Sequence, residues 1–212
     1  ASAITTGSDS DTIHINGGSG TGLGDSTIIS TGGDNDLSIV AEKSAMDGSS
    51  IRLEGDGNNA IFLDGDINAS EITALGGNDT LTVSGDVDTS DIDLGNGVNQ
   101  ATINGDVGDS AITTGNDTDS IAIFGAVTGS AIAAGNGANT VSVDSDYYAL
   151  SDSTLSSGND GSTIDVTGDT NGVIGDSSVT TGSGADTITI EGGSGSGKSG
   201  RHLQESCIVY TS

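Results

Sequence analysis

The chain has 212 residues, of which 36 are glycine, none is proline or tryptophan, and 2% are aromatic. Thirty-one acidic residues against four lysines and arginines give a formal net charge of −27, which argues against nucleic-acid binding because that requires clustered basic side chains. No apolar run is long enough to cross a membrane, and the single cysteine excludes an intramolecular disulfide and a cysteine-rich zinc site. With so few aromatic residues, a broad globular core is excluded, and any fold depends on a regular pattern.

A serine-led repeat begins at the first residues and continues to about residue 192. Its serines are spaced 20 to 24 residues apart, at Ser2, Ser26, Ser49, Ser70, Ser90, Ser110, Ser130, Ser153 and Ser177. A period of this size is typical of stacked units, none of which buries its apolar face alone. We therefore divide the chain into a repeat region at 1–192 and a non-repeat linker and tail at 193–212. That tail is either a non-native addition or a link to another domain.

Each repeat carries two apolar elements in the same order. The first follows the serine by two positions, at Ile4, Ile28, Ile51, Ile72, Ile92, Ile112, Ile132, Leu155 and Val179. The second is a pair that alternates with polar or small residues, as in Ile13/Ile15, Ile61/Leu63, Leu81/Val83, Ile121/Ile123, Ile164/Val166 and Ile188/Ile190. Alternation with period two indicates short strands with one buried face. Two such strands per repeat, joined by glycine-rich turns, predict an all-β, right-handed parallel β-solenoid (a β-roll or β-helix) of about nine coils of 20–25 residues.

The longer repeats carry their extra residues in one place, between the second strand and the next serine. These insertions fall at 16–25, 40–48, 144–152 and 167–176. Insertions on one edge of a solenoid often mark a binding face, but surface loops also tolerate insertions that have no function. Both interpretations remain open, and the adjacent pair Tyr147 and Tyr148 fits either.

The glycine-rich turns carry a motif with a known chemistry. The stretch Thr181-Gly-Ser-Gly-Ala-Asp186-Thr-Ile-Thr189 nearly matches the G-G-x-G-x-D-x-U-x nonapeptide, Gly77-Asn-Asp-Thr-Leu81 reproduces its core, and 135–141 keeps its frame. The chain therefore resembles the RTX calcium-binding β-roll repeats of large secreted bacterial surface proteins and adhesins. The resemblance implies Ca²⁺ held between coils by aspartate carboxylates and turn carbonyls, and a location outside the cell or on the bacterial cell surface. Only one of the two turns in each coil keeps the motif, because the other half has serine where the family has aspartate.

The resemblance also implies which residues would bind the metal. At the aspartate position of the motif, and two residues before it, the candidate calcium ligands are Asp9, Asp11, Asp36, Asp79, Asp117, Asp119, Asp160 and Asp186. In the second coil either Asn35 or Asp36 fits this position, and other coils have Asn59, Asn99, Asn139 or Ser162 there. Calcium would therefore occupy only some of the coils.

Three further acids, Asp66, Asp86 and Asp106, share one register. Stacking would place their carboxylates about 5 Å apart, and like charges opposed in a sheet are destabilising. A divalent cation would relieve this repulsion, and so would the hydration of an exposed edge.

The repeat predicts a structural rod, and the resemblance to RTX repeats implies that it belongs to an extracellular bacterial surface or adhesin-like protein and is braced by calcium. One alternative is a filament subunit that stacks end to end on copies of itself, with Ile208-Val209-Tyr210 adding as a strand to its own rod or to the next. Another is an ice-binding or glycan-binding solenoid, since Thr6, Thr31, Thr114 and Thr181 precede turn glycines, although Leu94 and Ala134 interrupt that row. An enzyme is not expected, because no H-E-x-x-H or G-x-S-x-G motif occurs and a catalytic pair is needed once, not in nine repeats.

Overall fold

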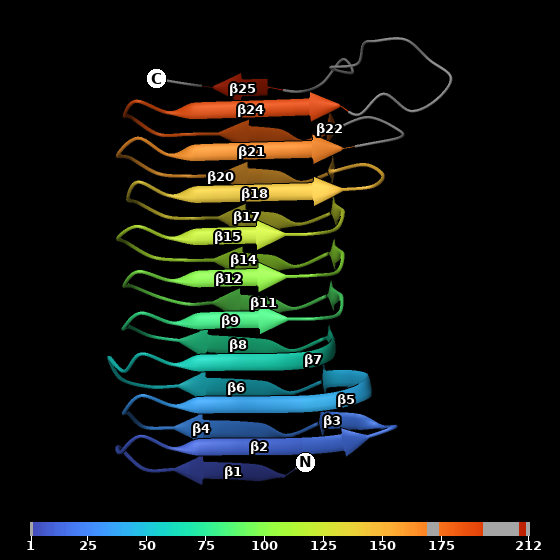
Figure 1. Ribbon diagram of the computed structural model, residues 1–212, viewed down its shortest axis with the longest axis vertical. Coiled ribbons are helices and arrows are strands. Elements are labelled where there is room, and N and C mark those ends of the chain that lie inside the picture. Colours follow the sequence, from blue (N-terminus) through green and yellow to red (C-terminus); the bar gives the residue numbers. More distant parts are fainter. Residues whose placement is uncertain (1, 169–173, 193–207, 211–212) are drawn as a thin grey trace.

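The computed structural model describes residues 2–168, 174–192 and 208–210, and these form a straight stack of β-strand coils (Figure 1). The described residues contain no helix, and therefore none that could cross a membrane. In Figure 1 the nearer strands run from left to right and the farther strands from right to left as the chain climbs, so the winding is right-handed. The predicted all-β parallel solenoid is confirmed.

The first sheet contains the strand that follows each repeat serine. It has ten parallel strands, β1 (Ala3–Thr6), β4 (Thr27–Ser30), β6 (Ser50–Leu53), β8 (Glu71–Ala74), β11 (Asp91–Asp93), β14 (Ala111–Thr113), β17 (Ala131–Ala133), β20 (Thr154–Ser156), β23 (Ser178–Thr180) and β25 (Ile208–Tyr210). Residues that share a position in the repeat are direct partners, as in the row Ile72, Ile92, Ile112 and Ile132. The serine period therefore sets the register.

The second sheet has fifteen strands, of which nine carry the alternating apolar pairs. These nine are β2 (Thr12–Gly18), β5 (Asp36–Asp47), β7 (Ala60–Asn68), β9 (Thr80–Val83), β12 (Gln100–Ile103), β15 (Ser120–Ile123), β18 (Thr140–Ser145), β21 (Thr163–Gly168) and β24 (Thr187–Gly192). Each of them follows one of the first nine strands of the first sheet. The nine predicted coils are thus nine strand pairs, related by eight coil-to-coil steps.

A third side of each coil was not predicted. It consists of short strands that precede the next serine, namely β3 (Thr21–Gly24), β10 (Val87–Asp88), β13 (Val107–Gly108), β16 (Val127–Thr128), β19 (Leu150–Ser151) and β22 (Ile174–Gly175). In the second and third coils this side is continuous with β5 and β7, where Met46 pairs with Ile67 and Ile67 pairs with Val87. The coil is therefore three-sided, and its third side adds one more apolar row to the core.

The core is a set of apolar rows that run along the rod axis. Ile28, Ile72, Leu81, Val107 and Ile132 are examples in which the side chain is fully buried. Stacking one strand spacing apart, about 4.8 Å, lets each coil bury its apolar face against the next. Small and aliphatic side chains suffice for such a narrow interior, which explains how a chain with almost no aromatic residues folds.

The insertions lie together along one edge of the rod, on the right in Figure 1. The first forms the β2–β3 connection, the second is absorbed in the long bulged strand β5, and the third follows β18. Part of the fourth, at 169–173, lies outside the described residues, as do 193–207 of the predicted linker and tail. Within that tail, β25 pairs in parallel with β23 of its own rod, so the expected strand addition by Ile208-Val209-Tyr210 is confirmed.

Candidate functional site

The repeat serines form a continuous ladder of hydrogen bonds inside one edge of the rod. The backbone N–H of each serine donates to the Oγ of the serine in the next coil, from Ser2 through to Ser177, at N···O distances of 2.9–3.2 Å. From Ser49 onward these serines are only 2–6% exposed. A buried backbone N–H needs a partner, and at this corner a side chain of the next coil supplies it.

Each serine hydroxyl in this ladder also donates a hydrogen bond. From Ser26 onward its Oγ lies 2.6–3.0 Å from the carbonyl oxygen two residues earlier. The residue between the two has a positive φ, as at Asp25, Gly48, Ala69 and Thr89, so the chain turns sharply there. From Ser26 onward each serine hydroxyl therefore accepts from the coil before it and donates within its own turn.

A second ladder lies inside the opposite edge, beside the glycine-rich turns. Here the backbone N–H of one coil donates to the side-chain oxygen of the next coil at 2.8–3.3 Å, through the column Asp11, Asn35, Asn59, Asp79, Asn99, Asp119, Asn139, Ser162 and Asp186. The residues from Asn35 to Ser162 are 1–5% exposed. This column is the aspartate position of the RTX-like motif, and in the second coil it is occupied by Asn35.

The asparagines of this second ladder satisfy both ends of their side chains. The Nδ2 of Asn99 donates to the carbonyl oxygens of Gly95 and Gly97, at 3.0 Å each, and Asn35 and Asn139 donate in the same way to their own turns. The amide group therefore links the coil-to-coil ladder to the turn. Because these turn carbonyls point inward, a donor at this position is what the fold requires.

The aspartates of the second ladder leave one oxygen unsatisfied. In Asp11, Asp79, Asp119 and Asp186 the Oδ2 atom is buried and has no hydrogen-bond partner, whereas Oδ1 of Asp79 accepts from the N–H and the amide of Asn59. The aspartates and asparagines occupy the same position of the repeat. The Oδ2 atom of an aspartate therefore takes the place of the Nδ2 atom that, in Asn99, donates to turn carbonyls. An ionised carboxylate would place negative oxygen against carbonyl oxygen at that point, which is unfavourable.

Burial accordingly shifts the acidity of two of these groups. Burial raises the pKa of Asp79 above its ordinary value, and the hydrogen bonds from Asn59 offset this only in part. Burial also raises the pKa of Asp119. Hydrogen bonds from the Asn99 N–H and from the side chains of Thr114 and Asn99 oppose this rise, and the nearby Asp117 carboxylate adds to it. Both carboxyl groups are therefore easier to protonate than an exposed aspartate.

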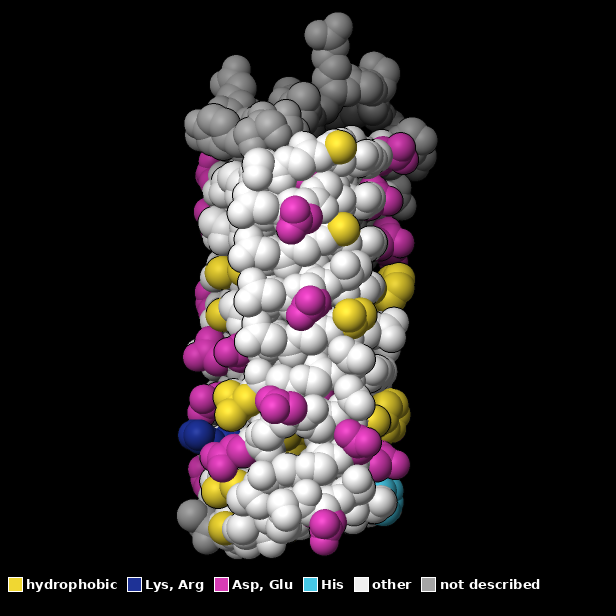
Figure 2. All heavy atoms as spheres, turned by 90° about the vertical axis from the view of Figure 1, so that its left-hand side faces the viewer, with side chains coloured by type: hydrophobic (Ala, Val, Ile, Leu, Met, Phe, Trp, Pro, Cys, Tyr) yellow, Lys and Arg dark blue, Asp and Glu magenta, His cyan; other side chains and the backbone are white. Residues whose placement is uncertain are grey.

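The other four candidate metal ligands do not join this column. Asp9, Asp117 and Asp160 are exposed on the turns, and the last two have φ values of 86° and 90° where neighbouring coils have Gly97 or Gly137. Asp36 is the exposed first residue of β5, one residue past the interior position. Figure 2 looks onto this turn edge and shows acidic side chains spread along it without gathering in one place.

The donor set offers part of a calcium site. In an aspartate-bearing coil such as that of Asp79, one free carboxylate oxygen faces the carbonyls of its turn, and oxygen donors are what Ca²⁺ prefers. A complete shell needs six to eight oxygens, and within the described residues no three acidic, histidine or cysteine side chains lie close enough to hold a metal. The aspartates also alternate with asparagine, because Asn99 separates Asp79 from Asp119. The residues therefore fit a cation only in the coils that have aspartate, and only if turn carbonyls complete its shell.

The acids that share a register outside the core are stabilised by backbone N–H groups. The Oδ1 of Asp66 accepts from Asp86 N–H at 3.0 Å, Asp86 does the same for Asp106 at 2.8 Å, and Asp106 does so for Ala126 at 2.7 Å. Each carboxylate is therefore held by the next coil. Neither a cation nor hydration alone is needed to explain why these three charges stack.

The threonine row that we considered for ice binding does not form an exposed array. Thr114 is 6% exposed, and Leu94 and Ala134 in the same row are fully buried. This position follows the first strand where the chain turns inward, so the expectation of a binding face on that row is wrong.

Comparison with known proteins does not identify a relative: no family model matches the chain, and neither a curated protein nor a solved structure matches it. The functional interpretation therefore depends on the ladders and surfaces of the rod itself.

Proposed function

We propose that this protein is a structural rod, a stiff spacer within an extracellular or cell-surface assembly of bacteria. The observation that carries the proposal is the serine ladder, which joins all nine coils from Ser2 to Ser177 without a break. The in-register apolar rows and the second ladder add two more continuous connections along the same axis. A repeated architecture with the same bonds at every level suits mechanical continuity, and it offers no single site at which catalysis would concentrate.

Calcium bracing is the finer part of this proposal, and it concerns the four interior aspartates. Two conditions satisfy a buried Oδ2 that faces carbonyl oxygens: a cation between them, or a proton that turns the carboxylate into a donor like the asparagine amide. Extracellular calcium at millimolar concentration would fill even weak sites. In the absence of calcium, protonation gives the same geometry without a metal.

The double substitution Asp79→Asn/Asp119→Asn separates these two conditions. Thermal unfolding of both proteins is followed by circular dichroism at neutral pH, once with EDTA and once with millimolar calcium. If calcium braces the turns, it raises the melting temperature of the wild type more than that of the double variant, because the variant keeps only Asp11 and Asp186 of the four interior carboxylates. A matched control, Asp144→Asn/Asp165→Asn, removes the same charge from exposed positions and keeps the response to calcium.

The opposite result would remove calcium from the proposal but leave the rod. In that result the wild type is equally stable in EDTA and in calcium, and the double variant is more stable than the wild type under both conditions. The rod itself has a separate test, since a monomer of elongated shape is expected by small-angle scattering. A compact particle would contradict the spacer role, and a series of multiples of the rod length would favour the filament alternative.

A second candidate function, ice binding, is favoured by the outward face of the second sheet. Thr80 and Thr82 on β9, Thr102 on β12 and Thr140 on β18 stand in register on this face. Gln100, Ser120, Ala122 and Ser142 complete these two columns, which carry no charge over four successive coils despite the overall charge of −27, although Asp144 follows Ser142 on the same face of β18. Two uncharged columns with a regular coil spacing are compatible with ordered water.

Thermal hysteresis of the purified chain tests this second function. Activity that is lost when Thr82→Lys and Thr102→Lys are introduced would support it, since both side chains lie at the centre of the face. No hysteresis in the wild type would exclude it and leave the rod proposal unaffected.

A further inference from the structure

The apolar residues of the two end coils are less well buried than those in the middle of the rod. In the first sheet Ile112 has no exposed surface, whereas Ile4 in the first coil is 38% exposed. In the second sheet the apolar pairs of the first and last long strands are only partly buried, namely Ile13/Ile15 on β2 and Ile188/Ile190 on β24. Among the described residues, β2 and β24 each lie at an edge of this sheet. Both ends therefore have apolar surface that one further coil would cover.

The end of the rod formed by β1 and β2 directs backbone donors outward. The second coil donates one N–H to the Ser2 carbonyl and another to the Asp11 carbonyl, at 2.9 Å each. Because the peptide unit is planar and trans, the N–H groups that follow these carbonyls, those of Ala3 and Thr12, point the opposite way, out of the rod. Ser2 and Asp11 are also the first residues of the two ladders. In each later coil the side-chain oxygen at these positions accepts an N–H from the preceding coil, so Ser2 and Asp11 supply the acceptors of this end.

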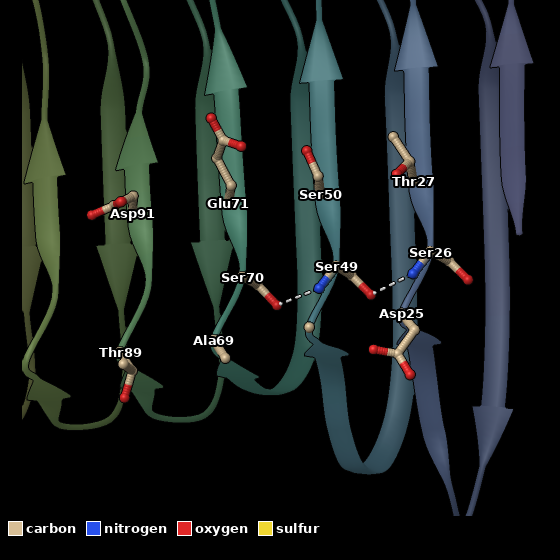
Figure 3. A pocket seen from close by; sticks show the side chains of 11 residues that line it. Asp25, Ser26, Thr27, Ser49, Ser50, Ala69, Ser70, Glu71, Thr89 and Asp91 are labelled. Carbon is tan, nitrogen blue, oxygen red and sulfur yellow. Dashed lines mark hydrogen bonds between the residues drawn. The ribbon is translucent and has the colours of Figure 1, made fainter. Parts of the chain in front are cut away.

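The end formed by β23 and β24 directs the matching backbone groups outward. At each step of the stack the ladder residue donates its N–H to the side-chain oxygen of the next coil, and Figure 3 shows this from Ser26 to Ser49 and from Ser49 to Ser70. The carbonyl of the same residue accepts an N–H from the next coil, at 2.9 Å for Ser49. In the last repeat the ladder residues are Ser177 and Asp186. The N–H and carbonyl groups of these two residues are therefore the ones that a further coil would bind.

The strands at the two ends also have closely similar sequences. Ser177-Ser-Val-Thr-Thr-Gly182 corresponds to Ser2-Ala-Ile-Thr-Thr-Gly7, and Asp186-Thr-Ile-Thr-Ile190 corresponds to Asp11-Thr-Ile-His-Ile15. Neighbouring coils within the rod pair equivalent positions in register. The same register between two chains would place the apolar residues of a first coil on those of a last coil, at the usual coil spacing of about 4.8 Å.

We propose that copies of this chain join head to tail, with β1 and β2 of one copy adding to β23 and β24 of another. The two N–H groups that point out of the first coil reach the ladder carbonyls of the last coil, and the ladder N–H groups of the last coil reach Ser2 Oγ and the Asp11 carboxylate. Both ladders and the apolar rows then continue across the joint. One end supplies the side-chain acceptors and the other the backbone donors to them, so the contact is heterologous. Because it does not close on itself, it makes linear chains of rods.

The C-terminal strand β25 occupies half of this joint in the single chain. It pairs with β23 from Ile208 opposite Ser178 to Tyr210 opposite Thr180, beyond the last full coil (Figure 1), which is the place that β1 of a second copy takes. While β25 is there, β1 could add only one coil further on, about 4.8 Å away, and β2 would not meet β24. As part of the same chain, this cap competes at an effective concentration in the millimolar range. The inference thus rests on the proposed rod, whose single-rod form is the capped state.

Breaking the cap in the full-length chain tests the proposal. In the first sheet the residue after each repeat serine donates its N–H to the preceding serine carbonyl, as Ser178 does to Ser153 at 2.9 Å. Ile208 holds the equivalent position in β25, and the Tyr210 N–H, two residues later, points the same way. Ile208→Pro/Tyr210→Pro removes both donors. In sedimentation experiments this variant should associate about a hundredfold more tightly than the wild type, which stays monomeric at micromolar concentration.

Val209→Pro is the matched control for the cap. The N–H of Val209 points away from β23, and proline is tolerated on the open side of an edge strand, so this variant should remain monomeric like the wild type. Small-angle scattering of the uncapped variant should give lengths that are multiples of the single rod.

Two prolines at the opposite end test the polarity of the joint. Ala3→Pro/Thr5→Pro removes N–H groups that point away from β4, so the pairing of β1 with β4 is preserved. Combined with Ile208→Pro/Tyr210→Pro, it should return the chain to a monomer. Mixed with the wild type, the combined variant should form one-to-one pairs that grow no further, because each partner then has only one open end. This pairing does not depend on how well the substituted first coil is folded.

Three results would overturn the proposal. The first is an uncapped variant that stays monomeric although its circular dichroism matches that of the wild type, and the second is equal association by Val209→Pro. The third is self-association of the combined variant, which would place the contact on another surface. None of these results bears on the rod itself, which a compact wild-type particle in scattering would contradict.

Discussion

The serine ladder and the asparagine–aspartate ladder make the same hydrogen bond between coils, a backbone N–H to a side-chain oxygen of the next coil. In the serine ladder every hydroxyl also donates to a carbonyl of its own turn, as Ser90 does to Asp88 at 2.7 Å. In the second ladder the asparagines donate in this way, but Asp79 and Asp119 cannot when ionised, and their Oδ2 atoms remain unsatisfied. The ladder on one edge therefore has no side chain that titrates near neutral pH, whereas the ladder on the other contains carboxyl groups whose pKa is raised by burial.

We therefore expect the stability that the two ladders provide to depend differently on pH. A uniform serine column gives stability that does not vary with pH or metal, because hydroxyls do not titrate. A column that mixes amides with acids gains sensitivity at a cost in stability at neutral pH. Changing single residues in each ladder shows whether this contrast is real.

The largest effect is expected from Asn99→Asp, which makes three successive coils acidic. The substitution removes the amide donors to Gly95 and Gly97 and places a buried carboxylate between Asp79 and Asp119. We expect a loss of unfolding free energy on the order of 3 kcal/mol at neutral pH without calcium. Urea denaturation measures it, and the exposed Asn104→Asp serves as the control that adds the same charge.

A reduced loss at low pH would support this account, since protonation restores a donor at residue 99. If Asn99→Asp proved as stable as the wild type at neutral pH in EDTA, the Asn99 amide would not be needed as a donor to its turn carbonyls.

A break in the serine ladder should cost somewhat less. Ser90→Ala leaves the buried N–H of Ser70 without its acceptor, 3.0 Å away in the wild type, and removes one of the two donors to the Asp88 carbonyl, which keeps the Ala69 N–H. One unsatisfied buried donor costs about 1–3 kcal/mol, and we expect a decrease of about 2 kcal/mol. Unlike that of Asn99→Asp, this decrease should be the same at every pH and with or without calcium.

Ser142→Ala is the matched control, because Ser142 is an outward residue of β18. It should change stability by less than about 0.5 kcal/mol. A similar loss from both serine variants would show that the ladder is not what distinguishes Ser90.

The two ladders also mark the limit of what the sequence predicts. The alternating pairs and the serine period predicted the strands, the register and the apolar rows, because strand geometry fixes which residues share a face. The role of Ser90 as a backbone partner was missed, since the residue before it, Thr89, has a φ of 52° and period two does not extend through such a turn. The short third-side strands were missed for a related reason: Val87–Asp88 is too short to show alternation.

The same limit applies to the candidate metal ligands. The motif identified Asp79, Asp119 and Asp186 correctly as members of one column, but it grouped them with Asp117 and Asp160, which the structure leaves exposed on the turns. Sequence spacing alone does not separate an inward residue from an outward one two positions earlier. In the second coil it left Asn35 and Asp36 as alternatives, and only Asn35 faces inward with its amide in the ladder. An alternating Asn and Asp pattern in that column was visible in the sequence and could have suggested an interior position.

A smaller and reversible effect is expected from pH. The pKa values of Asp79 and Asp119 are raised above their ordinary 3.8 in the folded state, so the folded protein binds these protons more tightly than the unfolded chain. Their contribution to stability is therefore fully present below pH 3.8 and is lost as the pH rises through the folded-state values. The difference in unfolding free energy between Asp79→Asn/Asp119→Asn and the wild type should increase over that range in EDTA.

Comparing the two proteins removes the contribution of the other acids, which they share. A difference that stays constant from pH 3 to about pH 7 would mean that neither interior carboxyl changes its protonation on folding. A difference that disappears only when calcium is added would indicate that a cation replaces the proton at these oxygens.

The smallest effect is expected at the turn that precedes the serine ladder. Thr89 adopts a φ of 52°, where the equivalent residues of other coils include Gly48 and Gly129. A β-branched residue is strained in this region, so Thr89→Gly should raise the unfolding free energy by about 1 kcal/mol despite the loss of the hydrogen bond from Thr89 to Asp88. Thr128→Gly, in strand β16, should lower the unfolding free energy, because glycine relieves no backbone strain there and loses more conformational entropy on folding than threonine. If both substitutions destabilise the rod equally, the turn at Thr89 stores no strain. The hydrogen bonds of the serine that follows would then hold the sharp bend without a loss of stability.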